Sequence, residues 1–460
     1  MKILFIHPAA DINLKIQEGL KYPPLGVAFI SAVALEQGHS VRIFDANVEK
    51  KPFHSMRKLL EDFQPDVVGI SFTSILSESA HFTAGFIKRT LPSAAVIAGG
   101  YHPTVEPLEV IKDANFDAVV VGEGEITFIE WLKAYASTDK DYSKIKGLVF
   151  RRNGRAIINP QRELIPDLDT LPLPAYGLLP ITRYSSMVST RSPYITFIRS
   201  RGCPFNCIFC GVQRMFGKKY RVQSPQKTIS EINRLIQEFK IKEVLFKDSD
   251  FLIDRNNVIK LCKLMIERKF DLVWSCNGRV DMVDEEIILL MRKAGCKMIT
   301  YGVESGNQEI LNNLKKEFTL EQVNKAMQIT KNAGIQVTLN IIFGSPQETK
   351  ESAQQTMTFV KQLDPDYLNS AFLTAFPGSS LYNDALTNGW FIDGEPNSSA
   401  YEQLRVNATK MSVKELSGLV KEAARAFYLR PGYIAKKLRH LSYAEMKNNF
   451  KGLWAIIKNY

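Results

Sequence analysis

The sequence predicts an α/β protein with two successive parallel sheets: a doubly wound, Rossmann-like sheet, then a partial (β/α)6 barrel of the TIM type, then a small helical region. Two stretches carry this prediction, residues 1–135 and the chain from Tyr194 onward, because in both apolar runs of strand length alternate with helical patterns. The runs are continuously apolar, as in strands buried on both faces. A proline-rich stretch interrupts the alternation and predicts a division into domains. We expect domains over 1–140, 191–395 and 396–460, with a linker over 141–190.

The first domain is expected to bind a ligand at the carboxyl ends of its strands, as doubly wound sheets do. No G-x-G-x-x-G fingerprint follows a strand, which disfavours a dinucleotide. Helices are expected near 25–37, 53–63, 78–90, 104–113 and 124–135. The expected strands are Lys2–His7, Ser40–Asp45, Asp66–Phe72, Ala95–Gly99 and Asp117–Val121.

The linker begins with a hairpin pattern over Lys146–Ile158, in which Asn153-Gly154 is a type I′ turn pair. A proline-rich run from Pro160 to Pro180 follows and predicts a semi-rigid connection. We therefore expect residues 136–190 to connect the two domains.

Six strand–helix units predict the partial barrel, whose site should lie at the carboxyl ends of its strands. Thr319-Leu-Glu-Gln322 is a capping box for a helix that ends before Gly334. The expected strands are 194–199, 242–247, 271–276, 296–303, 335–343 and 366–374.

Two further capping boxes, Ser412–Glu415 and Ser442–Glu445, predict C-terminal helices. The final segment is basic and amphipathic. A solvated face that covers the barrel is favoured over peripheral contact with a membrane surface.

Composition restricts the class of protein. The net charge of +11 comes from scattered basic residues, with no helix-turn-helix, zinc finger or aromatic-basic platform, so no nucleic-acid partner is expected. The N-terminal apolar run is too short for a signal peptide, and no apolar run approaches the roughly 20 residues of a membrane span. We expect a cytoplasmic protein. Three of the six cysteines, Cys262, Cys276 and Cys296, fall in apolar segments and are expected to be buried and inert.

The other three cysteines, Cys203, Cys207 and Cys210, lie within eight residues of one another in Arg201-Gly-Cys-Pro-Phe-Asn-Cys-Ile-Phe-Cys210, directly after an apolar strand. Three thiolates can hold a metal centre but are one ligand short of a closed tetrahedral site or a fully ligated [4Fe–4S] cluster. The alternatives are a zinc site with a remote fourth ligand and three unrelated core thiols.

Cys-x3-Cys-x-Phe-Cys resembles the cluster loop of the radical S-adenosylmethionine (SAM) superfamily. The resemblance implies a [4Fe–4S] cluster on Cys203, Cys207 and Cys210, with SAM on the open iron, and cleavage of SAM to a 5′-deoxyadenosyl radical. Later strand ends also resemble the family, including Lys247-Asp-Ser-Asp-Phe251, Tyr301-Gly-Val-Glu-Ser305 and Asn340-Ile-Ile-Phe-Gly-Ser-Pro346. The implied SAM-binding residues are Phe209, Asp248, Asp250, Asn277, Arg279, Glu304, Ser305 and Gly344.

The first domain resembles the cobalamin-binding domain fused to many radical SAM enzymes. Four stretches in order carry this resemblance: Pro23–Gly26, Pro65–Ser71, Gly99–Thr104 and Val121–Glu125. The resemblance implies that Ser71–Leu76 lies beneath the cobalt, and because the Asp-x-His-x-x-Gly pattern of cobalt-coordinating histidines is missing, no strong ligand is expected there. The implied cobalamin-binding residues are Pro24, Leu25, Gly26, Ser71, Thr73, Ser74, Gly99, Gly100, His102, Gly122 and Glu123, with His102 near the nucleotide tail.

Together the resemblances imply an enzyme that methylates an unactivated carbon of a small-molecule substrate through methylcobalamin. The runner-up is non-methylating chemistry, such as anaerobic cyclisation or rearrangement, and a third hypothesis is a cobalamin sensor with a vestigial barrel. An electron donor such as flavodoxin or ferredoxin is the expected partner.

Overall fold

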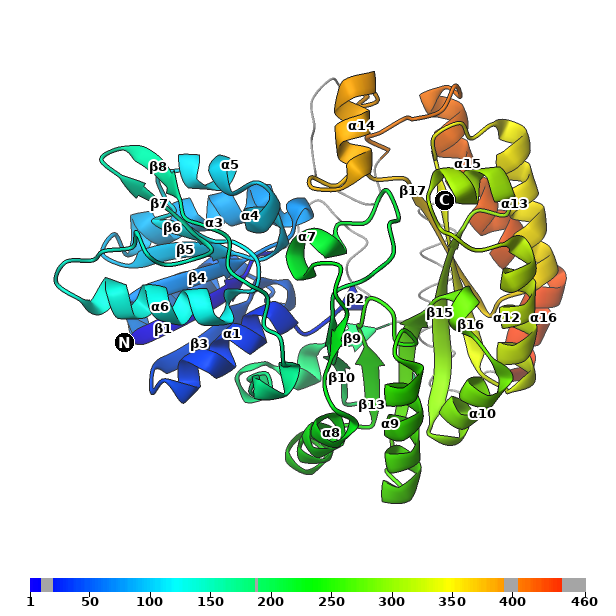
Figure 1. The fold of residues 1–460 in the computed structure, drawn as a ribbon, viewed down its shortest axis with the longest axis horizontal. Coiled ribbons are helices and arrows are strands. Elements are labelled where there is room, and N and C mark those ends of the chain that lie inside the picture. The colour runs from blue at the N-terminus through cyan, green and yellow to red at the C-terminus, as the bar shows by residue number, and fades with distance from the viewer. Residues whose placement is uncertain (10–19, 187–188, 393–403, 441–460) are drawn as a thin grey trace.

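The computed structural model describes residues 1–9, 20–186, 189–392 and 404–440. Two sheets follow one another along the chain. The loop that connects β11 (Ser200–Arg201) to helix α7 (Val212–Phe216), called the cluster loop below, lies between the sheets together with α7 (Figure 1). The predicted fold class is confirmed.

The first sheet has seven strands in the order β3-β1-β4-β5-β6-β7-β8, of which the first five are parallel. Side chains alternate between its faces. Leu4 and Ile6 of β1 pack with α2, α3 and α5, whereas Ile3 and Phe5 pack with α1 and α6. Helices therefore cover both faces, as doubly wound topology requires. The elements are β1 Lys2–His7, α1 Leu25–Glu36, β3 Ser40–Asp45, α2 Pro52–Phe63, β4 Val67–Ser71, α3 Ser77–Thr90, β5 Ala95–Gly99, α4 Tyr101–Val105, α5 Pro107–Lys112, β6 Ala118–Val120 and α6 Gly124–Ala136.

The expected hairpin forms from β7 (Leu148–Arg152) and β8 (Arg155–Ile158) around Asn153-Gly154, whose φ angles of 53° and 75° suit a type I′ turn. We expected this hairpin in the connector between the domains. It belongs instead to the first sheet, because β7 pairs antiparallel with β6 and extends that sheet. Edge strand β6 would otherwise leave backbone groups unpaired on that side. The domain limits themselves remain a prediction.

The second sheet is a parallel six-stranded partial barrel, in the sequential order β10-β13-β14-β15-β16-β17. The capping box at Thr319 is confirmed, and α12 ends before Gly334. The elements are β10 Tyr194–Phe197, β11 Ser200–Arg201, β12 Arg221–Val222, α8 Pro225–Phe239, β13 Glu243–Phe246, α9 Arg255–Arg268, β14 Val273–Gly278, α10 Glu285–Lys293, β15 Cys296–Glu304, α11 Gln308–Asn313, α12 Leu320–Asn332, β16 Gln336–Phe343, α13 Lys350–Leu363, β17 Tyr367–Phe372 and α14 Ser380–Asn388.

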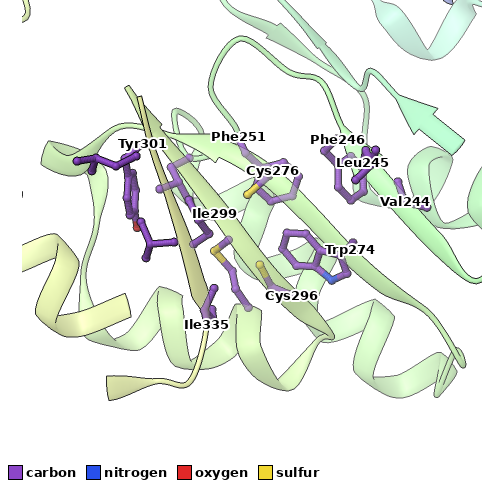
Figure 2. Packing of buried hydrophobic residues seen from close by; sticks show 14 of the residues in the cluster. Val244, Leu245, Phe246, Phe251, Trp274, Cys276, Cys296, Ile299, Tyr301 and Ile335 are labelled. Atoms are coloured by element: carbon purple, nitrogen blue, oxygen red, sulfur yellow. The ribbon is translucent and has the colours of Figure 1, made fainter. Parts of the chain in front are cut away.

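Aromatic and sulfur-containing side chains fill the barrel core around Trp274 (Figure 2). The centroid of its indole ring lies 5.1 Å from the ring centroid of Phe251, and the indole N–H donates to the carbonyl of Ala294 at 2.8 Å. Cys276 and Cys296 lie in this core, and Cys262 is buried with them. The expectation that these three thiols are buried is confirmed.

Helix α15 (Val413–Tyr428) begins with the predicted capping box of Ser412 and Glu415. It packs against β17, and its apolar face is buried as expected. Helix α16 (Pro431–His440) follows, while the box at Ser442–Glu445 lies outside the described residues. Among the described residues, no helix combines the length and hydropathy that crossing a bilayer requires.

Candidate functional site

The three cysteines lie on a loop between β11 and α7, and backbone contacts hold that loop in place. The amide of Cys203 donates to the carbonyl of Gly217 at 3.2 Å, and Cys210 donates to Cys207 at 3.1 Å. Gln213 of α7 donates its side-chain amide to the carbonyls of Cys203 and Phe205 at 3.0 and 2.6 Å. The first half of the loop is thereby tied to α7 and to Gly217 directly after it.

The thiols are accessible within a partly enclosed setting. Cys203 and Cys207 are half-buried, and Cys210 keeps an exposed rim although protein surrounds it on most sides. Burial raises the pKa of Cys203, so binding iron must displace a proton from this thiol. Among the described residues, no three His, Cys, Asp or Glu side chains are grouped so that they could hold a single metal ion.

Asp248, an expected SAM ligand at the end of β13, is fully buried and holds the chain segment that leads into the cluster loop. Its Oδ1 accepts from the backbone amides of Arg199 and Ser200 at 2.9 and 2.7 Å, and from the Ser200 hydroxyl at 2.7 Å. Its Oδ2 lies 3.2 Å from Nε of Arg199, which is itself fully buried over the ring of Phe251. Asn277, another expected ligand, donates to the carbonyl of Asp248 at 3.2 Å.

Asp250 differs from Asp248 in having one oxygen that makes neither a hydrogen bond nor an ion pair among the described residues, whereas Oδ2 of Asp248 is ion-paired with Arg199. Oδ1 of Asp250 accepts from the amide of Leu252 at 2.7 Å, but the buried Oδ2 has no hydrogen-bond partner in the described part of the chain. Burial raises the pKa of Asp250 to about 7. Its charge also contributes to the raised pKa of Cys203, which places it near the cluster loop.

Arg279, an expected SAM-binding residue, forms a bidentate ion pair with Asp281. Nε and Nη2 donate to the two carboxylate oxygens, each at 2.9 Å, and Nη2 also donates to the carbonyl of Lys316 at 2.7 Å. The guanidinium lies 3.5 Å from the ring centroid of Phe205 in the cluster loop. Arg279 thus connects β14 to that loop.

Glu304, at the end of β15, pairs with Lys316 at 3.2 Å, and both side chains are buried. The ammonium of Lys316 lies 5.8 Å from the ring centroid of Phe209. Sequence reasoning missed Lys316, because a lysine in a turn after a short helix is usually solvated. The neighbouring Ser305 is engaged elsewhere, with its hydroxyl 3.1 Å from that of Thr356.

Gly344, at the end of β16, has a φ of 98° and donates its amide to Oε2 of Glu348 at 2.6 Å. The same oxygen accepts from Ser345 at 3.3 Å. Burial raises the pKa of Glu348 to about 7. Glu348 shapes the loop expected to approach adenine, and a carboxylate two residues after Pro346 was the signal that sequence reasoning passed over.

A second candidate site is an apolar cavity at the carboxyl ends of β4, β5 and β6. Phe29 and Phe128 contribute to its walls, and the expected residues Pro24, Thr73, Ser74 and His102 do not line it. The expected residues that line it are Leu25, Gly26, Ser71, Gly99, Gly100, Gly122 and Glu123.

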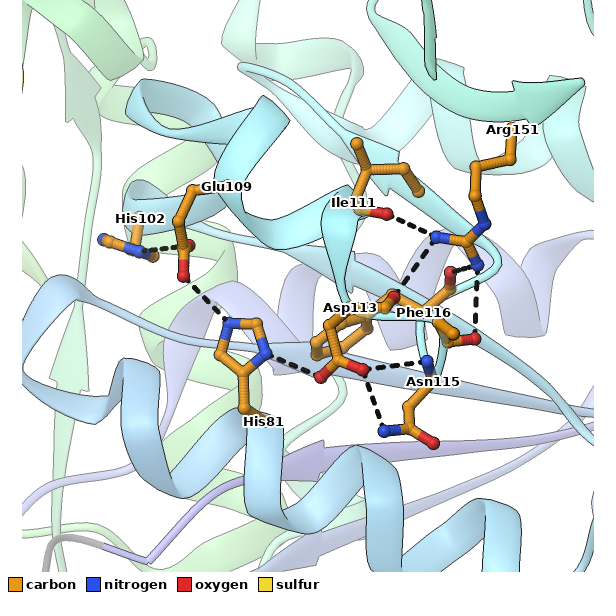
Figure 3. A network of polar contacts seen from close by, with 9 residues as sticks. His81, His102, Glu109, Ile111, Asp113, Asn115, Phe116 and Arg151 are labelled. Atoms are coloured by element: carbon orange, nitrogen blue, oxygen red, sulfur yellow. Dashed lines mark hydrogen bonds and ion pairs between the residues drawn. The ribbon is translucent and has the colours of Figure 1, made fainter. Parts of the chain in front are cut away.

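His102 lies instead in a polar network with Glu109, which also contacts His81 (Figure 3). Its Nδ1 is 3.0 Å from the hydroxyl of Ser74, and its Nε2 is 3.2 Å from Glu109. Glu109 also faces His81, which contacts Asp113 at 2.7 Å. Hydrogen bonds from the two histidines lower the pKa of Glu109 to about 2. Both ring nitrogens of His102 are therefore occupied.

The barrel domain closes the cavity. Ile198, Arg201, Met215 and Phe216 flank the cysteine loop on both sides and line the same cavity as the first domain. Arg201 also forms buried ion pairs with Glu123 and Glu125 of the first domain. The wall between the cavity and the cluster loop is therefore built from residues of both domains.

The residues present fit the three expected cofactors. Three thiols on one tied loop suit a cluster with an open iron. The unpartnered Oδ2 of Asp250 suits the ammonium of SAM. The cavity fits part of a cobalamin because Gly122 in its wall faces open space: a Cβ there would have no heavy atom of the described residues within 4 Å.

Comparison with known proteins identifies the family of the chain. Residues 197–360 match the sequence model of the radical SAM superfamily, and residues 15–132 match that of the B12 binding domain. An uncharacterized methyltransferase from Pyrococcus horikoshii is 32% identical over 439 residues, which cover 95% of each chain. The anaerobic magnesium-protoporphyrin IX monomethyl ester cyclase of Rubrivivax gelatinosus is 30% identical, over 84% of this chain and 70% of its own.

Among solved structures, the radical SAM methyltransferase TsrM from Kitasatospora setae, with tryptophan and a SAM analogue bound, shares the fold. The TM-score is 0.70 at 17% identity, over 85% of this chain and 77% of TsrM. The family match indicates an iron–sulfur cluster, and not a zinc ion, as the metal centre of this chain. This chain belongs to the radical SAM superfamily, in the group with an N-terminal cobalamin-binding domain, and is an enzyme that uses a [4Fe–4S] cluster, SAM and cobalamin.

Proposed function

We propose that the enzyme transfers a methyl group from cobalamin to an unactivated carbon of a small-molecule substrate. The observation that carries the proposal is the shared wall. Ile198, Arg201, Met215 and Phe216 flank the cluster loop and also close the cavity of the cobalamin-binding domain. A substrate held beside this wall meets both cofactors at once.

When bound, the cluster and SAM supply a 5′-deoxyadenosyl radical, and cobalamin supplies the methyl group. The protein contributes position and exclusion of water. Cys203, Cys207 and Cys210 hold the cluster on their tied loop. The free oxygen of Asp250 accepts from the ammonium of SAM, and we assign Gly344, at the end of β16, to the adenine side of the site.

The buried pair of Glu304 and Lys316 completes this cradle. Its two charges lie on the cluster side of the barrel, where both influence the thiol of Cys210, whose pKa is raised chiefly by burial. Phe209 lies beside the ammonium of Lys316. We assign Asp248 and Arg279 a supporting role, since each is held by another residue of the protein.

The cluster assignment is tested with Cys207→Ala. We expect the reconstituted variant to lose the iron and sulfide that the wild type binds, and to lose SAM cleavage. Cys262→Ala is the matched control, because this thiol is buried in the barrel core and should leave iron content unchanged. A variant at Cys207 that keeps a full cluster and cleaves SAM would refute the assignment.

Methylation is tested by anaerobic turnover with SAM, methylcobalamin and a reductant, using candidate substrates. We expect 5′-deoxyadenosine and S-adenosylhomocysteine in equal amounts, since each methylation consumes one SAM for the radical and one to restore the methyl group. Deoxyadenosine alone, with a substrate converted but not methylated, would overturn methyl transfer.

That outcome would favour the second candidate function, an anaerobic oxidative cyclisation or rearrangement. The 30% identity to the Rubrivivax cyclase supports it, since that enzyme matches over most of both chains. The Pyrococcus methyltransferase, which matches at 32% over 95% of each chain, favours the first candidate.

A one-electron carrier must reduce the cluster, and flavodoxin or ferredoxin is the partner that we propose. The net charge of +11 suits an acidic carrier. An accessible cysteine loop also requires reducing conditions, so we place the enzyme in the cytoplasm. Reduction of the cluster by purified flavodoxin, measured by electron paramagnetic resonance, tests the partner.

A further inference from the structure

Four buried charges join the two domains directly beside the cluster loop. Arg201 contacts Glu123 at 3.2 Å and Glu125 at 2.5 Å, and Arg221 contacts Glu123 at 2.9 Å. None of the four side chains is more than 7% exposed. We propose that this charge network couples cobalamin binding to assembly of the cluster, with Arg201 as the positioning residue that connects the two sites.

The two arginines require partners from the other domain. Arg201 and Arg221 are directly opposite one another on the antiparallel strands β11 and β12. Like charges in this arrangement repel, and burial makes the repulsion worse. Glu123 and Glu125 neutralise them, so the two-stranded sheet at the base of the cluster loop is complete only when the cobalamin-binding domain is docked against it.

The network reaches the cavity as well as the loop. Glu123, Glu125 and Arg201 all line the cavity, and the guanidinium of Arg201 lies 5.2 Å from the ring centroid of Phe29 and 5.5 Å from that of Phe216. Oε2 of Glu125 is buried, and it has no hydrogen-bond partner among the described residues. A donor on the bound cobalamin would satisfy this oxygen and fix the carboxylate that holds Arg201.

Arg201 is two residues before Cys203, while Phe216 follows the loop in α7. The loop is thus bracketed by two residues of the cavity wall. A cluster bound to the cysteines fixes Arg201 on that wall before cobalamin arrives, so cobalamin should bind more tightly to the cluster-loaded protein. By thermodynamic linkage, cobalamin must then stabilise the cluster by the same factor.

The test measures the affinity of the full-length protein for hydroxocobalamin by anaerobic equilibrium dialysis, with cobalt counted by mass spectrometry. Chelator-treated protein is compared with protein carrying a reconstituted cluster. We expect the dissociation constant to be about ten-fold lower with the cluster, within the range typical of coupled sites. In Arg201→Met this ratio should fall towards one, while Arg201→Lys should restore part of it.

Lys297→Met is the matched control. It breaks another buried ion pair, with Glu243 at 2.6 Å, on strands of the barrel that do not reach the cavity. A merely structural contribution would weaken cobalamin binding equally with and without the cluster and would leave the ratio unchanged, as we expect for this control. Glu125→Gln, which preserves shape, should lower the ratio without the folding risk of a buried arginine replacement.

The reciprocal measurement is the rate of iron loss to a chelator, which hydroxocobalamin should slow in the wild type but not in Arg201→Met. Equal affinities of wild-type protein with and without the cluster would overturn the proposal. An unchanged ratio in both Arg201→Met and Glu125→Gln would overturn the assignment to this network. Neither measurement needs substrate or turnover, so the outcome is independent of whether the enzyme methylates.

Discussion

Replacing Gly100 by alanine should damage the cobalamin cavity through the backbone. Gly100 has φ 99° and ψ −166°, a conformation that is essentially restricted to glycine. A Cβ there would lie 2.7 Å from the carbonyl oxygen and 2.9 Å from the amide nitrogen of Phe72. Because both are backbone atoms of a buried strand end, they cannot move aside cheaply.

The magnitude follows from a matched pair of variants. Gly122→Ala, in the same cavity, has a positive φ of 80° but no atom within 4 Å of the added Cβ. It should cost about 1–2 kcal/mol of backbone strain. Gly100→Ala adds about 1–3 kcal/mol of overpacking, so it should destabilise the first domain by about 2–5 kcal/mol.

Hydrogen exchange of the cofactor-free protein, read by mass spectrometry on peptides from β4 and β5, measures this difference locally. Peptides from the barrel strands β14 and β15 serve as the internal reference. We expect a larger loss of protection in Gly100→Ala than in Gly122→Ala, with the barrel peptides unchanged. Equal losses in the two variants would refute the reasoning from close approach.

Three other perturbations follow from the site. Gly211→Ala would place a Cβ 1.8 Å from the hydroxyl of Tyr101. We therefore expect the reconstituted variant to bind less iron and sulfide, and a second change, Tyr101→Ala, to restore the cluster content. Unchanged cluster content in the single variant would contradict this contact. Asp250→Asn should weaken SAM binding about 10- to 100-fold in equilibrium dialysis, the value of a charge-assisted hydrogen bond, and unchanged affinity would remove this residue from the cradle. Burial raises the pKa of Glu348 from 4.5 to about 7, so its contribution to stability is fully present below pH 4.5 and lost as the pH rises through 7, by up to about 3 kcal/mol. Thermal unfolding at pH 5.5 and 8 should show a weaker dependence in Glu348→Gln than in the wild type, since Asp250, whose pKa burial also raises to about 7, contributes to both, and equal dependence would contradict the prediction.

The fold could be predicted closely because both sheets are parallel and buried. Such strands are continuous apolar runs, and their helices start and stop at recognisable residues such as Thr319 and Gly38. The eleven strands predicted for the two sheets differ from their expected limits by at most two residues at either end, whereas the two-residue strands β11 and β12 were not predicted. The hairpin at Asn153-Gly154 was predicted, but its position was not, because a local turn signal does not say which sheet edge a hairpin will pair with.

The candidate site followed from the sequence in composition more than in detail. Spacing singled out Cys203, Cys207 and Cys210 as candidate ligands, and strand ends singled out Asp250 and Glu304, all of which stay predictions. Sequence alone could not show that Asp248 forms an ion pair with the buried Arg199. A carboxylate at a strand end gives the same sequence pattern whether it faces a ligand or a buried guanidinium. Lys316 was missed for the opposite reason, since its burial depends on the tertiary position of a turn.

Glu123 shows that a residue can line a binding cavity although both of its carboxylate oxygens are already paired with other residues of the protein. Its carboxylate is taken by Arg201, Arg221 and the amide of Ile165 at 2.7 Å, so it lines the cavity as a neutralised group. Replacing a carboxylate in such a buried network leaves uncompensated positive charge, which is far costlier than losing one ligand contact. Loss of cobalamin binding in a variant of Glu123 would therefore report on the joining of the two domains, and the affinity ratio with and without the cluster separates this effect from direct recognition.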